Sequence, residues 1–232
     1  MGEDSLFILP VFELGSLQIT NTVITTWIVM AITTCLAWLA TRRLEMKPGR
    51  VQTLIEAIVL ISEDSIRGIT PQHAQRILPF IASLWLFIVI ANLIGLIPGI
   101  HSPTRDLSAT AALAFLVFLS VHWFGIRIQG LKNYLLHYLQ PSPIMLPFHI
   151  ISELTRTVAL AVRLFGNMMS LEMVALLILL VAGFLVPVPI LMLHIVEALV
   201  QAYIFGMLAL IYVAGGLQSQ QRQIQTEEEN HD

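Results

Sequence analysis

Five apolar stretches, each about long enough to cross a lipid bilayer, are the strongest constraint on how this chain can fold. One lies at residues 23–41, two lie within residues 77–126, and two lie within residues 144–216. A membrane helix needs about 20 mainly apolar residues to cross a hydrocarbon core about 30 Å thick. The composition agrees, because 56% of the residues are hydrophobic and only 12% are charged. We therefore expect an all-α polytopic membrane protein with about five membrane-crossing helices.

The last pair of stretches is longer than a bilayer requires. Residues 148–184 contain no proline, so one continuous helix would be roughly 55 Å long at 1.5 Å per residue. A mismatch of that size predicts a helix that is strongly tilted, bent or extended beyond the hydrocarbon core. Pro187 and Pro189 then indicate a tight turn, and residues 190–214 return as the last helix. We therefore expect residues 144–216 to form a long tilted hairpin.

The segments outside the spans differ in composition. Residues 42–76 begin with basic residues and continue with apolar residues at helical spacing, which is typical of an amphipathic helix on the membrane surface. Residues 127–143 have the composition of a polar connector before the hairpin. The tail at residues 217–232 is rich in Gln and Glu, a composition that favours a solvated and partly disordered segment.

Positive charge is distributed very unevenly between the two sides of the predicted membrane. Nine Lys and Arg residues fall in the three segments just described, whereas only Arg105 falls on the opposite side. Loops rich in Lys and Arg stay on the cytoplasmic side of a membrane. We therefore expect residues 1–22 to form an external segment and the carboxyl terminus to lie in the cytoplasm.

The chain carries no signal for enzymatic chemistry of its own. Cys35 is the only cysteine, so there is no disulfide framework and no thiolate metal site. The sequence contains no Gly-rich phosphate-binding loop, no usable metal-ligand spacing and no Ser-His-Asp set. We therefore expect no cofactor, no bound metal and no nucleic-acid partner, and we expect any nucleotide chemistry to belong to a partner protein.

Ionisable residues inside the predicted hairpin are the strongest functional signal. Arg163 lies in an apolar run, and an arginine at the centre of a membrane helix costs about 2.5–3.5 kcal/mol on insertion scales. At 3.6 residues per turn it shares a helix face with Asn167, while Glu172 points to the opposite side. Spacings of three and four residues produce two more polar stripes, which are His149, Glu153 and Arg156, and then His194, Glu197 and Gln201. Intramembrane groups of this kind line an ion path or pair with one another.

Part of this pattern resembles a known family. The runs AVRLFGNM at residues 161–168 and QAYIF at residues 201–205, with Glu172 and His194 between them, are similar to subunit a of the F-type ATP synthase, in its membrane F0 sector. The resemblance extends over residues 27–216 and is strong from residue 153 onward.

The resemblance implies the stator ion-channel subunit of a rotary ATP synthase in a bacterial inner membrane, which is not catalytic by itself. Arg163 would be the essential fixed charge beside two half-channels that carry protons, or sodium ions, coupled to rotation of a ring. The implied ion-path residues are Glu172, His194, Glu197, Gln201, Asn167, Asn92, Glu153 and His149. The implied partners are the ring of c subunits, b-type peripheral stalk subunits, the F1 sector indirectly, and membrane lipids.

Several alternatives stay open at this point. Residues 156–159 (RTVA) and 170–171 (SL) replace patterns that are common in the family, which leaves the coupling ion undecided between H+ and Na+. Glu153 and Arg156 are equally well explained as a local ion pair, and Asn92 as a hydrogen bond to a neighbouring helix. The main rival function is a self-contained secondary transporter or ion channel. It would need its own substrate site and usually an internal repeat, and neither is recognisable in the sequence.

Overall fold

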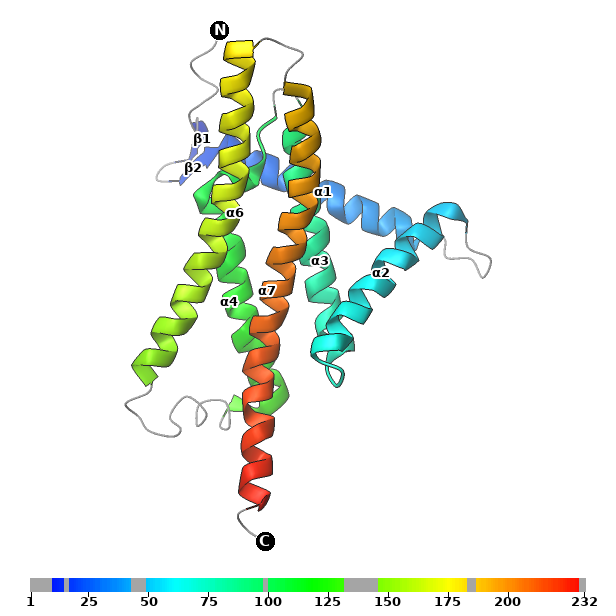
Figure 1. Ribbon diagram of the computed structural model, residues 1–232, viewed down its shortest axis with the longest axis vertical. Coiled ribbons are helices and arrows are strands. Elements are labelled where there is room, and N and C mark those ends of the chain that lie inside the picture. Colours follow the sequence, from blue (N-terminus) through cyan, green and yellow to red (C-terminus); the bar gives the residue numbers. More distant parts are fainter. Residues whose placement is uncertain are drawn as a thin grey trace.

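The computed structural model describes residues 10–14, 17–42, 49–97, 100–131, 146–182 and 187–229. Within these residues, five helices are long and apolar enough to cross a membrane (Figure 1). They are α1 (Asn21–Thr41), α3 (Ala74–Leu93), α4 (Leu107–Gln129), α6 (Leu146–Ala182) and α7 (Pro187–Glu229). The prediction of an all-α polytopic membrane protein is therefore confirmed, with one short strand pair added before α1.

That strand pair consists of β1 (Pro10–Leu14) and β2 (Leu17–Thr20), which run antiparallel. Phe12 is paired with Ile19 in the register. Aromatic and β-branched residues favour strands, but runs of four and five residues are too short for their periodicity to predict them. The strand pair contacts the start of α1 and lies at one side of the helical bundle in Figure 1.

Helix α1 stands apart from the other spans. It crosses the bundle in Figure 1 and makes most of its helix contacts with α3. Trp27 and Trp38, toward its two ends, are exposed, and the guanidinium of Arg42 lies 4.6 Å from the ring centroid of Trp38. Tryptophan prefers the interface between membrane and water, so Trp38 and Arg42 mark one end of the span. Most of the surface of α1 is left to contact lipid or a partner.

Helix α2 (Arg50–Ile69) is the amphipathic helix that the sequence predicts. One face packs against α3 and buries Ile66 completely, while another face exposes Ile58, Leu60 and Ile61. The helix also carries charged residues. An amphipathic helix of this kind lies at the boundary between lipid headgroups and acyl chains.

The core forms where α3, α4, α6 and α7 meet. Its buried side chains come from all four helices and include Ile77, Ile81, Ile88, Ala114, Val117, Leu160, Ala161, Leu164, Ala202, Phe205, Ala209 and Leu210. The many small residues allow the helices to approach closely. At Gly206 the approach is so close that an added Cβ would overlap the indole of Trp85. Trp85 also stacks on Tyr203 with ring centroids 5.9 Å apart, so α3 and α7 are held in one register.

The connection between α3 and α4 is short and capped. It contains two 3-10 turns, η1 (Ile94–Leu96) and η2 (Pro103–Arg105). Asp106 begins α4 by accepting a hydrogen bond from the backbone N–H of Ser108 at 2.9 Å, which satisfies a free donor at the helix start. The helix ends at Gly130, whose φ of 83° is a conformation that glycine adopts without strain.

Helices α6 and α7 form the long hairpin that the sequence predicts. Helix α6 has 37 residues, so it is roughly 55 Å long, and it contacts α7, beside which it lies in Figure 1. Pro187 and Pro189 belong to the first turn of α7, where a missing backbone N–H removes no helical hydrogen bond. Val186, the first residue of the predicted turn, lies outside the described residues.

The tail corrects a prediction, because it is helical rather than partly disordered. Helix α7 continues through Glu229, beyond residue 216 where the hairpin was expected to end. Gln, Glu and Arg are good helix formers, and no Gly or Pro follows Gly216 to stop the helix. Most of the connector predicted at residues 127–143 lies outside the described residues.

Candidate ion path

Arg163 lies near the middle of α6 with an exposed side chain. Its neighbours Leu160, Ala161 and Leu164 are buried in the core, so Arg163 lies on the outward face of the helix. Within the part of the chain that the structure describes, Arg163 makes no hydrogen bond and no ion pair. Because a guanidinium is charged at any physiological pH, its presence in a membrane span is costly unless a group beyond the described residues offsets it.

The face of α6 around Arg163 consists of small side chains. Ala159, Gly166 and Ser170 lie four, three and seven residues from Arg163 and are all exposed. A Cβ added at Gly166 would meet no atom within 4 Å. Small residues on a membrane helix allow another helix to approach closely. This face is therefore open to a partner helix.

One turn beyond Arg163, Asn167 joins α6 to α7. Its Nδ2 donates to Oε1 of Gln201 at 2.6 Å, and Gln201 is only 2% exposed. The Nε2 atoms of Gln201 and His194 are buried and have no partner among the described residues. An unsatisfied polar group in a bilayer costs several kcal/mol, so these atoms favour water between the helices. Asn167, Gln201 and His194, which the sequence predicted for the ion path, are thus the polar residues that supply these groups on α6 and α7.

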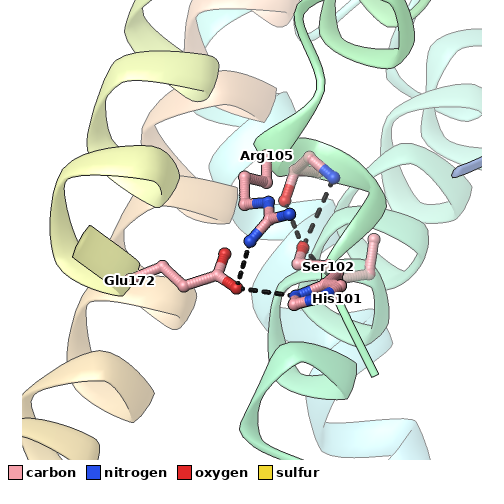
Figure 2. Close-up of polar contacts among 6 residues, drawn as sticks. His101, Ser102, Arg105 and Glu172 are labelled. Atoms are coloured by element: carbon pink, nitrogen blue, oxygen red, sulfur yellow. Dashed lines mark hydrogen bonds and ion pairs between the residues drawn. The ribbon is translucent and has the colours of Figure 1, made fainter. Parts of the chain in front are cut away.

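Glu172 is held by residues from outside the hairpin (Figure 2). Its Oε1 accepts a hydrogen bond from Nη1 of Arg105 at 2.7 Å and lies 2.9 Å from Nδ1 of His101. Both partners come from the loop between α3 and α4. Glu172 therefore faces this loop, whereas Arg163 faces outward, as the helical spacing predicts.

Sequence reasoning did not include His101 and Arg105 in the site. They lie 71 and 67 positions before Glu172, so no helical spacing connects the three residues. One signal was present, because Arg105 is the only cation on its side of the predicted membrane. A single cation on that side of the membrane is a reason to look for a carboxylate in the adjacent span.

Asn92 is fully buried and joins three elements. Its Nδ2 donates to the carbonyl oxygen of Ala198 in α7 at 3.3 Å, and its Oδ1 accepts from Oγ1 of Thr104 in η2 at 2.7 Å. These bonds are of the interhelical kind that the sequence left open as the alternative to a place in the ion path. They brace the loop that carries His101 and Arg105.

A second polar cluster lies toward the other end of α6. A cavity of about 290 Å³ is lined by residues of α4, α6 and α7, among them His149, Glu153, Arg156 and Tyr212. The guanidinium of Arg156 lies 5.6 Å from the ring centroid of Tyr212. In the described structure Arg156 forms no ion pair with Glu153, so the local pair left open by the sequence is not present. Nδ1 of His122 in α4 lies 3.9 Å from Oε1 of Glu153.

Not all of the predicted residues are brought into contact. Among the described residues, no hydrogen bond or ion pair joins Glu172 to His194 or Glu197. Glu197 is half-buried on α7 and also makes no such contact with the described part of the chain. The site therefore consists of separate polar clusters, one at Glu172, one along α7 and one at Glu153, with Arg163 between the first and the last along α6.

These features define a class of protein. It is a multi-pass helical membrane protein whose longest hairpin carries an outward arginine, with a carboxylate cluster on either side of it along the helix.

Comparison with known proteins identifies the family. The chain matches the family model for the ATP synthase A chain over residues 23–214. It is 63% identical over 208 residues to ATP synthase subunit a 2 of Pelobacter propionicus, covering 90% of this chain and 91% of that protein. It is 54% identical over 228 residues to ATP synthase subunit a of Legionella pneumophila (strain Corby), covering 98% of this chain and 99% of that protein. The chain therefore belongs to the ATP synthase subunit a family, as a membrane subunit of the F0 sector.

Proposed function

We propose that this protein is the stator ion-path subunit of a rotary ATP synthase, in which Arg163 is the fixed charge opposite a turning ring of c subunits. The observation that supports this most strongly is the exposed Arg163, which pairs with no described residue and lies on a face of small side chains. A ring carboxylate about 4 Å from the guanidinium would be attracted by about 4 kcal/mol at an effective dielectric constant of about 20. That attraction favours the ionised carboxylate, so a loaded ring site releases its ion near Arg163.

Two separate access paths would supply and remove the ion. Glu172, nine residues after Arg163, lies roughly 14 Å further along α6, and its partners line a cavity of about 400 Å³. Glu153, ten residues before Arg163, lies roughly 15 Å away in the other direction and lines the cavity of about 290 Å³. An ion crossing directly from one path to the other would pass the guanidinium, which repels it.

The remaining polar residues of the hairpin extend these two paths. His194, Glu197 and Gln201 would continue the external path along α7, and Asn167 would connect it to α6 near Arg163. His149 would take part in the cytoplasmic path beside Glu153. Histidines and carboxylates suit this role because they exchange protons near neutral pH. The transported ion is a proton or a sodium ion, and each one releases about 2.3 kcal/mol per 100 mV on crossing the membrane.

The rival function, a self-contained transporter or channel, fits the position of Arg163 poorly. Such a protein binds its substrate between its own helices, near the middle of the membrane. Arg163 instead lies on the outward face of α6, away from the core formed by α3, α4, α6 and α7. A charge in that position acts on a partner rather than on a substrate inside the chain.

The same proposal places the protein in a bacterial inner membrane, with residues 1–22 outside and the carboxyl terminus in the cytoplasm. The uneven distribution of Lys and Arg supports this orientation. Besides the c ring, we propose b-type peripheral stalk subunits as partners, with the F1 sector connected through them. The exposed apolar surface of α1 provides area for a stalk helix or for lipid.

Substitution of Arg163 tests the proposed function. Reconstituted complexes carrying Arg163→Lys or Arg163→Ala should lose at least about 100-fold of the ATP synthesis driven by an imposed ion gradient. Lysine keeps the charge but changes its reach and donor geometry, and alanine removes the charge. Arg127→Ala is the matched control, because Arg127 lies over Trp123 at 5.8 Å near the end of α4, outside the proposed path, and it should keep synthesis within about twofold. Gradient-driven synthesis at the normal rate in assembled Arg163→Ala complexes would overturn the proposal.

A further inference from the structure

The contact between Glu172 and the loop before α4 uses one carboxylate oxygen for two partners. Arg105 and His101 both meet Oε1, at 2.7 Å and 2.9 Å, whereas no described residue bonds to Oε2 (Figure 2). The side chains are only partly exposed, at 18% for Arg105, 33% for His101 and 21% for Glu172. A partly buried pair is screened less by salt than a surface pair, so the guanidinium acts strongly on this carboxylate.

The loop holds Arg105 and His101 in place through buried hydrogen bonds. Oγ of Ser102, between the two residues, donates to the carbonyl oxygen of Ala91 at 2.7 Å. Thr104, next to Arg105, is fully buried and bonds to Asn92 at 2.7 Å. Side chains presented from a braced loop keep a defined geometry, which a functional charge pair needs.

A cavity of about 400 Å³ lies beside this pair. Its lining includes Asn21, Thr25, His101, Arg105 and Asp106 together with apolar side chains of α6. Glu172 does not line the cavity, whereas His101 and Arg105 line it and also contact the carboxylate. An ion that enters through the cavity therefore meets His101, Arg105 and the nearby Asp106 before it reaches Glu172.

We infer that Arg105 is the counter-charge of the external ion path, a positioning residue that weakens the binding of an incoming cation to Glu172. This inference rests on the proposed function. A guanidinium remains charged under all physiological conditions, so it competes permanently with an incoming proton or sodium ion for the carboxylate. Because of this competition, an ion that binds to Glu172 is released again instead of staying bound there. Oε2 is the oxygen left to bind the ion. His101 contacts Oε1 together with Arg105 and lines the cavity.

The test measures how ATP synthesis depends on the ion concentration at the external ion path. In proteoliposomes with F1 facing outward, this path opens to the interior of the vesicle. Proteoliposomes with F1 facing outward are loaded with buffers covering a range of pH and Na+ concentration, and synthesis is driven by a fixed potassium diffusion potential. Removing the counter-charge in Arg105→Gln should lower the internal ion concentration for half-maximal synthesis by about tenfold, because an opposite charge at this distance changes ion binding by about one to three orders of magnitude. The maximal rate should fall, because the ion leaves Glu172 more slowly.

The controls separate this role from a structural one. Arg105→Lys keeps the charge, so its ion concentration for half-maximal synthesis should be close to the wild-type value. Arg67→Gln is the matched control, because Arg67 pairs with Glu63 at 2.6 Å on α2, outside the path, and it should change neither quantity. If Arg105→Gln does not assemble, Glu172→Asp replaces it, since a shorter side chain loosens the pair and should shift the half-maximal concentration in the same direction.

Two outcomes would overturn the inference. One is a lower maximal rate with an unchanged half-maximal concentration, which indicates a purely structural pair. The other is no change at all in assembled Arg105→Gln or Glu172→Asp complexes. Either result leaves the proposed function standing as long as Arg163→Ala abolishes coupled synthesis, so the two proposals fail separately.

Discussion

The arginines of this chain differ in whether a described residue contacts their charge. Arg105 pairs with Glu172, and Arg42 and Arg127 lie over tryptophan rings near the ends of their helices. Each of these contacts offsets part of the cost of placing a guanidinium near lipid. Arg163 has no such contact among the described residues, although it lies deepest within its span. Under the proposed function, a carboxylate of the c ring offsets this cost.

Gly206 makes the most specific prediction about packing at a single residue. Gly206→Ala places a methyl group where the indole of Trp85 lies, so Trp85 must leave its stack on Tyr203. We expect the free energy of unfolding of the detergent-solubilised complex to fall by about 1–3 kcal/mol, measured as a lower thermal midpoint. Gly68→Ala is the control, because its Cβ would meet nothing within 4 Å and alanine favours the helix. An unchanged midpoint for Gly206→Ala would contradict the packing described between α3 and α7.

At the scale of elements, the spans were predictable because hydrophobic length is a local property of the sequence. Helices α1, α3 and α4 follow from runs of about 20 apolar residues, and the exceptional length of α6 follows from the lack of proline after Pro147. The short strands β1 and β2 were not predictable, because four or five residues carry too little periodicity. The helical tail was missed because a composition rich in Gln and Glu also suits a solvated coil.

The candidate site was predictable only where it depends on one helix. Spacing along α6 placed Arg163 and Glu172 on opposite faces, and the structure has the same arrangement. The contacts between elements could not be derived, because Arg105 and Glu172 are separated by 67 positions. Asn92 shows the same limit. A lone asparagine in a span looks the same in the sequence whether it lines an ion path or forms a hydrogen bond with a neighbouring helix.

At the scale of the whole molecule, the orientation of the bundle sets which path is external. Single cysteines at Ser108 and at Ser219, in a background where the exposed Cys35 is replaced by serine, report the two sides. Ser108 is exposed at the start of α4, directly after the loop between α3 and α4. We expect an impermeant maleimide to label the Ser108 position on intact cells, and the Ser219 position only after permeabilisation. Labelling of the Ser219 position on intact cells would reverse the assignment of the two paths.

In the proposed function, one charge keeps two aqueous paths apart. Glu172 and Glu153 lie on either side of Arg163 along α6, each associated with its own cavity. Without the guanidinium, an ion could pass from one path to the other along the face of small side chains without turning the ring.

Passive ion uptake into vesicles under an imposed potential measures this separation most directly. Wild-type, Arg163→Lys and Arg163→Ala complexes are compared at equal assembly, with no nucleotide present. We expect wild-type and Arg163→Lys membranes to stay ion-tight, because both keep a cation at the centre of α6. Arg163→Ala membranes should take up the ion at a rate proportional to the amount of complex. An Arg163→Ala membrane as tight as the wild type would contradict the role of Arg163 as the barrier between the two paths.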